Sequence, residues 1–307
     1  MRASRIPSTR LWFRRSTQRC STSRAARQCS PLPFQDWLLA AAFVAAAAVV
    51  LRRRVRPVVL WPALCLIVLT PQFGDSIGDG HADPQLARLV GLAAVCGAVW
   101  VLERDGRLLA LSGILLAGAV LTKREGLALA LLLAVAFAIA ARVDGSRKWW
   151  RAFLLVPCLV LATLPWQIWL RAEHVHAETD YSLRLLLRPG ILSHRLDRLR
   201  IALERLPQIA FSFDHWILLI PLALFLALLA VRIRSSLAVL VVSLILLGYV
   251  GLACVYWVGI LPIDWYLRTS ASRVIASLVV AVGVLVPLVA AELLRTEHGH
   301  EQGDAPA

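Results

Sequence analysis

The stretch LTKREGLALA, residues Leu121 to Ala130, interrupts two long apolar runs with a short charged segment. GRLLALSGILLAGAV (106–120) lies before it, and LALALLLAVAFAIAA (127–141) continues it; neither carries a charge after Arg107. Each run has roughly the length of a short membrane-spanning helix. The charged residues between the runs therefore predict the tight turn of a helical hairpin in a membrane.

The same alternation of apolar blocks and charged connections extends over most of the 307 residues. Hydrophobic residues make up 59% of the chain and its mean hydropathy is +0.71, which is too apolar for a soluble domain of this size. We therefore predict an all-α integral membrane protein, a polytopic bundle of about nine transmembrane helices. The predicted spans are 37–51, 57–71, 84–102, 106–121, 126–141, 152–170, 216–231, 236–259 and 274–292.

The basic residues predict which connections face the cytoplasm. Arginines gather in alternate connections, and short basic loops stay on the cytoplasmic side of a membrane. We therefore place the polar tail 293–307 in the cytoplasm as well. The connections left for the opposite, outer face are 72–83, 122–125, 171–215 and 260–273.

The first 35 residues differ in composition from the rest, because they are rich in Arg and Ser and contain no Asp or Glu. A transit peptide, a disordered basic leader and a mis-assigned start codon all fit this composition. We treat 1–35 as a leader and 36–292 as the membrane domain. The net charge of +14 does not predict a nucleic-acid partner, because the arginines lie in this leader or between apolar blocks.

The outer connection 171–215 is long enough to hold structure of its own. Within it, ILSHRLDRLRIALERL (191–206) spaces leucines alternately four and three residues apart, with arginines between them. This pattern predicts an amphipathic helix lying on the membrane surface, and a packed helix between spans is the alternative. Upstream, His174 and His176 have no third ligand nearby, so no metal site is predicted, and the use of a divalent metal stays open.

The ionisable residues of the outer connections are the candidates for chemistry. Arg can bind phosphate through two parallel hydrogen bonds, and a Lys ammonium at headgroup depth can meet a lipid phosphate. Such a surface suits group transfer from a lipid-phosphate donor at the membrane face. Two alternatives stay open: Lys123 and Glu125 only solvate their turn, or the protein is a transporter, whose charges would lie near the midplane.

Four segments, in this order, resemble polyprenyl-phosphate-dependent glycosyltransferases of the GT-C superfamily, especially bacterial relatives of protein O-mannosyltransferase and aminoarabinose transferase. GHADP (80–84) is similar to the G-Y-A-D-x-P opening of a transmembrane helix, and LTKREG (121–126) is similar to the L-T-K-x-E-G hairpin. LPWQIW (164–169) resembles the L-P-W-x-x-W helix end. IDWYLRTSASR (263–273) is similar to a D-x-x-W-H-L-x-T-S-x-x-R segment, with Tyr266 where His is usual.

The resemblance implies an active site on the non-cytoplasmic face, here of a bacterial plasma membrane, where an acid deprotonates an acceptor and a sugar leaves polyprenyl phosphate with inversion. No cofactor is implied. The candidates in the matching segments are the acids Asp83, Glu125 and Asp264 as catalytic residues, and Lys123, Arg268, Arg273 and Tyr266 as substrate-binding residues.

One part of the resemblance is missing. The family's main catalytic acid lies in a large outer loop after its first transmembrane helix, and no residue of this chain takes that place. Asp36 follows PLPFQ, which is not a family motif, and is not assigned that role. The chain therefore resembles the later two-thirds of such an enzyme, and an inactive remnant is a further interpretation.

Overall fold

The structure is a computed structural model that describes residues 31–303 apart from 76, 78–80, 175–189, 191–192 and 194. Within these ranges the chain is helical and contains no β-strand, as the fold-class prediction requires. His176 and most of the predicted leader lie outside the described residues. The elements are α3 (Pro31–Leu51), α4 (Pro57–Val68), α5 (Pro71–Asp75), α6 (Asp83–Glu103), α7 (Gly106–Thr122), α8 (Glu125–Val143), the 3₁₀ helix η2 (Trp149–Leu154), α9 (Leu155–Ala172), α11 (Leu196–Ala210), α12 (Phe213–Trp216), α13 (Leu219–Val231), α14 (Ser236–Val258), α15 (Ile263–Gly283) and α16 (Val286–Gly303).

Six helical segments in the described chain are long and apolar enough to cross a membrane. They are Phe34–Leu51, Asp83–Glu103, Glu125–Val143, Trp149–Ala172, Ser236–Val258 and Ile263–Thr296. The other three predicted spans fall on the shorter apolar helices α4, α7 and α13. At 1.5 Å per residue the 12 residues of α4 reach only about 18 Å, well short of a hydrocarbon core of about 30 Å. The predicted count of nine spans is therefore not confirmed.

Apolar side chains cover the outside of the bundle as well as its core. Leu161, Phe225, Leu228, Leu246 and Val250, which belong to α9, α13 and α14, are each more than half exposed. Soluble proteins rarely expose contiguous apolar surface of this extent, whereas lipid chains accept it. The pattern indicates that the bundle is embedded in a membrane.

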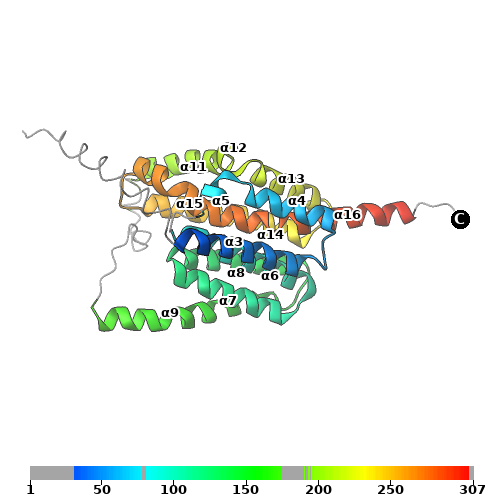
Figure 1. Ribbon diagram of the computed structural model, residues 1–307, viewed down its shortest axis with the longest axis horizontal. Coiled ribbons are helices and arrows are strands. Elements are labelled where there is room, and N and C mark those ends of the chain that lie inside the picture. Colours follow the sequence, from blue (N-terminus) through cyan, green and yellow to red (C-terminus); the bar gives the residue numbers. More distant parts are fainter. Residues whose placement is uncertain are drawn as a thin grey trace, which may run out of the picture.

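Most helices run along the long axis of the molecule, with α6 near the middle (Figure 1). The helix α6 packs against α3, α7, α8 and α15, and α14 packs against α8, α11 and α13. Figure 1 shows α9 at one edge of the bundle, in agreement with its low burial. The deepest part of the core lies between α6 and the second half of α15, where nearly every residue is buried.

Ion pairs join the connections between helices at each of the two ends of the bundle. Arg54 pairs with Glu103, and Arg104 pairs with Asp144, so the connections after α3, α6 and α8 meet. At the opposite ends of the same helices, Asp83 pairs with Lys123. We call these the Arg54 end and the Lys123 end. This grouping agrees with the alternation predicted from the basic connections.

The predicted hairpin at 122–125 is present, and Gly126 explains how tight it is. The helix α7 ends at Thr122 and α8 begins at Glu125. A Cβ on Gly126 would lie 2.3 Å from the carbonyl oxygen of Ala119, which is far inside van der Waals contact. Glycine is needed here because two helix ends approach closely, and positive φ plays no part.

Two predicted boundaries change. The segment 260–273 was expected as a connection, yet it supplies the first half of α15. In the predicted leader, residues 31–35 belong to α3. Both changes lengthen helices, and the first decides which residues of the fourth motif can reach one another.

The predicted amphipathic helix exists as α11, and it lies alongside α14. Arg195 donates to the carbonyl of Gly259, Arg198 donates to that of Tyr256, and the hydroxyl of Tyr249 donates to the carbonyl of Leu203. Residue numbers rise along α11 as they fall along α14, so the two helices are antiparallel neighbours. Ala202 and Leu206 of α11 are buried and Leu199 is partly buried, whereas Leu196 and Leu203 are exposed. Part of its apolar face thus packs on the bundle, which is the alternative that the sequence had left open.

Candidate functional site

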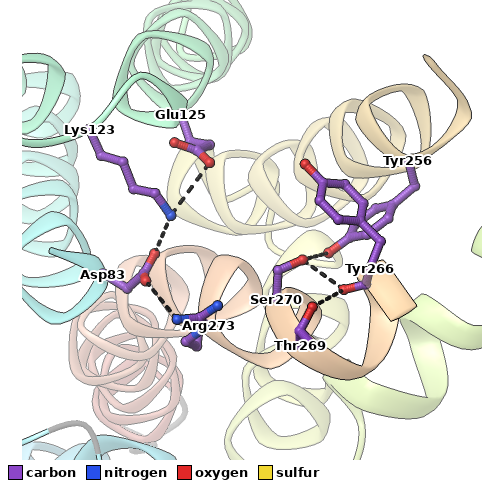
Figure 2. Close-up of polar contacts among 8 residues, drawn as sticks. All are labelled: Asp83, Lys123, Glu125, Tyr256, Tyr266, Thr269, Ser270 and Arg273. Atoms are coloured by element: carbon purple, nitrogen blue, oxygen red, sulfur yellow. Dashed lines mark hydrogen bonds and ion pairs between the residues drawn. The ribbon is translucent and has the colours of Figure 1, made fainter. Parts of the chain in front are cut away.

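Four ionisable side chains meet at the Lys123 end (Figure 2). The ammonium of Lys123 lies 2.6 Å from Oδ1 of Asp83 and 3.4 Å from Oε1 of Glu125. Nη1 of Arg273 lies 3.9 Å from Oδ2 of Asp83. Four residues predicted as site residues, from three distant parts of the chain, thus form one cluster.

Each member of this cluster is held by a helix end or a helix face. Asp83 is the first residue of α6, where a carboxylate interacts favourably with the helix dipole. The N-cap position itself is taken by Ala82, which has no side chain that could cap the helix. Lys123 has an extended backbone just after α7, Glu125 opens α8, and Arg273 lies within α15.

A cavity of about 460 Å³ opens between α8, α14 and α15 beside the cluster. Lys123, Glu125 and Arg273 lie in its lining. Most of the remaining wall is apolar and comes from Leu127, Ala128, Leu129, Leu131, Leu132, Gly248, Gly251, Leu252, Val255, Val274 and Leu278. A charged rim joined to an apolar wall fits an amphiphile with a polar head and a hydrocarbon chain.

Hydroxyl groups and aromatic rings form the part of the cavity wall that Figure 2 shows across from the ion cluster. The hydroxyls of Tyr256 and Ser270 lie 3.2 Å apart, and the ring of Tyr256 meets the predicted residue Tyr266 edge-on at 5.1 Å. Thr269 completes this hydroxyl wall. Sequence reasoning missed Tyr256 and Ser270, because their partners become visible only when α14 and α15 pack.

Two predicted residues lie away from the cavity. Asp264 and Arg268 are exposed, and neither is among the residues that line it. Nε of Arg268 donates to the backbone carbonyl of Asp264, 3.1 Å away, which is a contact within one helix. The geometry gives Asp264 no place beside the other acids.

A second buried ion pair was also missed. Arg88 on α6 is 4% exposed, and Nη1 of its guanidinium lies 3.5 Å from Asp36 of α3. Gln85 also donates to Asp36. The signal was in the sequence, since Arg88 is a charge inside a predicted span and such residues are rarely without a role.

The charges of the cluster balance, and this limits what it can bind. Asp83 and Glu125 offset Lys123 and Arg273, so a polyanion would have to displace a carboxylate from Lys123. Arg273 is less engaged, because its nearest carboxylate oxygen is 3.9 Å away and its Nε has no hydrogen-bond partner among the described residues. Arg273 is therefore the cation best placed to receive an anionic headgroup.

The described residues contain no group of three or more His, Cys, Asp or Glu side chains placed to hold a metal ion. No protein-family model, curated protein or solved structure matches the chain. The candidate chemistry of this site therefore rests on its own residues.

Proposed function

We propose that the protein is a GT-C-type membrane glycosyltransferase that takes its sugar from a polyprenyl-phosphate donor. One observation carries the proposal: Asp83, Lys123, Glu125 and Arg273 converge on the rim of a 460 Å³ cavity whose wall is mostly apolar. The phosphate would lie at Arg273 and Lys123, and the isoprenoid chain would lie along the leucines of α8. The bilayer would supply the donor directly to this wall.

The cluster has the groups that the transfer reaction needs. The acceptor hydroxyl oxygen would form a bond to the anomeric carbon of the sugar, and its proton would pass to Asp83 or Glu125. The bond from that carbon to the phosphate oxygen would break, and the electron pair would leave with the phosphate. The cations Arg273 and Lys123 would stabilise the charge that develops on the leaving group.

The proposal includes an orientation. All nine apolar segments would cross the membrane, the shorter ones by thinning the bilayer locally, and the Arg54 end would face the cytoplasm. The Lys123 end would then face the periplasm of a bacterium. A cysteine introduced at Thr122 should react with an impermeant thiol reagent added from outside, and protection there would reverse the orientation.

Binding of a lipid phosphate to the purified protein in nanodiscs tests the proposal. Undecaprenyl phosphate should bind saturably, as measured by native mass spectrometry. Arg273→Ala and Lys123→Ala should each weaken binding by about tenfold to a hundredfold, because each removes a charge-assisted hydrogen bond. Lys123→Arg keeps the charge and should retain most of the binding.

The chain offers a matched control on the same helix. Arg268 also lies on α15 but is exposed and away from the cavity, so Arg268→Ala should bind the lipid phosphate normally. Equal losses in Arg268→Ala and Arg273→Ala would mean that binding follows net charge alone. Full binding in Arg273→Ala would remove the proposed headgroup site.

A transporter is the second candidate function, and one observation favours it. Ion pairs link the connections at the Arg54 end while a cavity opens beside the Lys123 end, as in one state of an alternating-access carrier. Reconstituted protein would separate the two functions. A transporter would move a lipid phosphate or sugar across the vesicle membrane without breaking a bond, whereas a transferase would release product on one side.

A further inference from the structure

A second, much smaller cavity lies beside Arg273 and is separate from the large one. Its volume is about 30 Å³, and Asp83, Trp216, His81 and Gln72 also line it. One water needs about 10–15 Å³ of such volume, so the cavity can hold one oxygen-sized group but neither a sugar ring nor a phosphate. Arg273 lines both cavities and is the wall that they share.

Two buried N–H groups on residues of this cavity have no hydrogen-bond partner among the described residues. They are the indole Nε1 of Trp216, a residue that is only 1% exposed, and Nε of Arg273. Leaving a buried donor unsatisfied costs about 1–3 kcal/mol. Two such donors at one small cavity indicate a ligand that accepts hydrogen bonds.

The same cavity also contains an acceptor. Asp83 lines it, and Oδ2 of Asp83 lies 3.9 Å from Nη1 of Arg273, which is too far for a direct hydrogen bond. Polar groups at this separation are commonly bridged by a third polar atom. A ligand between them can therefore donate a hydrogen to the carboxylate.

The charges around the cavity select the ligand's chemistry. An anion such as chloride would satisfy the two N–H donors but would be repelled by the carboxylate of Asp83. A cation would suit Asp83 but would meet the guanidinium of Arg273. A neutral hydroxyl accepts from donors and donates to a carboxylate, so it satisfies all three groups.

We propose that the small cavity binds one neutral hydroxyl group, which accepts hydrogen bonds from Trp216 and Arg273 and donates its own hydrogen to Asp83. The hydroxyl belongs to a water or to an acceptor alcohol. The site itself stands on the geometry alone; its role in transfer rests on the proposed function. In that role the site places the acceptor oxygen beside Asp83, which makes Asp83, ahead of Glu125, the residue that receives its proton, and Trp216 a positioning residue.

A cryo-EM structure of the full-length protein in nanodiscs, at a resolution that shows ordered waters, tests the site. Density for one oxygen is expected about 2.7–3.2 Å from both Nε1 of Trp216 and Nε of Arg273. In Trp216→Phe, which keeps a buried ring but loses the donor, this density should disappear. A wild-type map without density there, at a resolution that shows waters elsewhere in the core, overturns the proposal.

Activity distinguishes the two sources of the hydroxyl. With a radiolabelled glycosyl polyprenyl phosphate, water yields free sugar and added methanol yields the methyl glycoside. Trp216→Phe should lower both products at least tenfold and leave binding of undecaprenyl phosphate unchanged. Loss of lipid-phosphate binding together with activity would give Trp216 a structural role and would contradict the positioning role.

Trp257 supplies the matched control, because its indole N–H is also buried without a partner among the described residues but it lines neither cavity. Trp257→Phe should keep both the oxygen density and the activity. Absence of any product from the wild-type protein, with the density present, would refute the proposed transferase function and leave the hydroxyl site intact. The two failures are therefore distinguishable.

Discussion

The two ends of the bundle each use four charged residues, yet they use them differently. At the Arg54 end the pairs are direct: Nε and Nη2 of Arg54 lie 2.5 and 2.6 Å from the two carboxylate oxygens of Glu103, and Arg104 lies 2.5 Å from Asp144. At the Lys123 end, the 2.6 Å contact between Lys123 and Asp83 is the close one, and the other contacts are 3.4 and 3.9 Å.

The two ends also differ in how deeply their acidic side chains are buried. The side chains of Glu103 and Asp144 are 44% and 42% exposed, whereas that of Asp83 is 9% exposed. Exposed ion pairs such as these, which we call latches, link helices but contribute little to stability. A buried carboxylate beside a loosely held Arg273 keeps hydrogen-bonding capacity for a ligand, which is what a binding site needs. The burial and closeness of the ion pairs, more than the number of charges, therefore separate a structural end from a candidate site.

Removing Asp83 should give the largest effect on stability. Asp83→Ala leaves Lys123 and Arg273 with Glu125 as their remaining acid in the cluster, and breaks the link between α6, α15 and the hairpin. Breaking a buried pair typically costs about 3–5 kcal/mol. We expect a loss of this size in the free energy of unfolding, measured with denaturant in detergent micelles. A loss below about 1 kcal/mol would place Asp83 with the latch residues.

The second-largest loss of stability is expected for a glycine in the turn at the Lys123 end. The corresponding substitution of a glycine at the Arg54 end should cost less. Gly126→Ala puts a Cβ 2.3 Å from backbone atoms of Ala119, so the hairpin must open, at a cost of about 2–3 kcal/mol. Gly145, in the connection after α8, has φ of +73° and open space around it. Gly145→Ala should cost only about 1–2 kcal/mol of backbone strain.

The position of Lys123 separates these two substitutions in a second way. Gly126→Ala should also weaken lipid-phosphate binding, because it displaces the backbone next to Lys123, whereas Gly145→Ala should leave binding unchanged. Native mass spectrometry with undecaprenyl phosphate measures both. Unchanged binding in Gly126→Ala would show that the cluster tolerates an open hairpin.

Much of the helical architecture was readable from the sequence, because apolar runs and charged turns are local signals. The turn at 122–125 was predicted where it lies, and all predicted spans fall on helices. The count of spans was less predictable, since the length of a helix depends on where its ends pack. The placement of α11 could not be predicted either, because leucine spacing defines an apolar face without naming the surface that covers it.

The fourth motif shows why the candidate site was only partly predictable. Treated as a loop, IDWYLRTSASR allows Asp264, Arg268 and Arg273 to converge. As a helix that turns about 100° per residue, it puts Asp264 about 180° away from Arg273, on the opposite face. Tyr266 lies seven residues before Arg273 and shares its face, and it does line the cavity. The sequence analysis did not predict that α15 begins at Ile263, and this helix start determines which of the candidate residues lie close together.

A larger side chain on the apolar wall of the large cavity should weaken lipid-phosphate binding moderately. Gly251 on α14 lines the large cavity, and a Cβ there would lie 3.2 Å from Leu132. Gly251→Leu should weaken binding of undecaprenyl phosphate about tenfold, or about 1.4 kcal/mol, by occupying the space of the chain. Binding of inorganic phosphate, which has no hydrocarbon chain, should be unchanged. Equal losses for both probes would mean that the chain lies elsewhere.

The smallest effect is expected for a latch residue of the Arg54 end. Asp144→Asn removes one charge of an exposed pair, so the free energy of unfolding should fall by at most about 0.5 kcal/mol, and less at high salt. Lipid-phosphate binding should not change, because Asp144 lines neither the large nor the small cavity. A transporter would respond differently: weakening the closed end would shift its conformational equilibrium and alter binding at the Lys123 end. Altered binding in Asp144→Asn, with stability preserved, would therefore favour alternating access over a transferase with a fixed site.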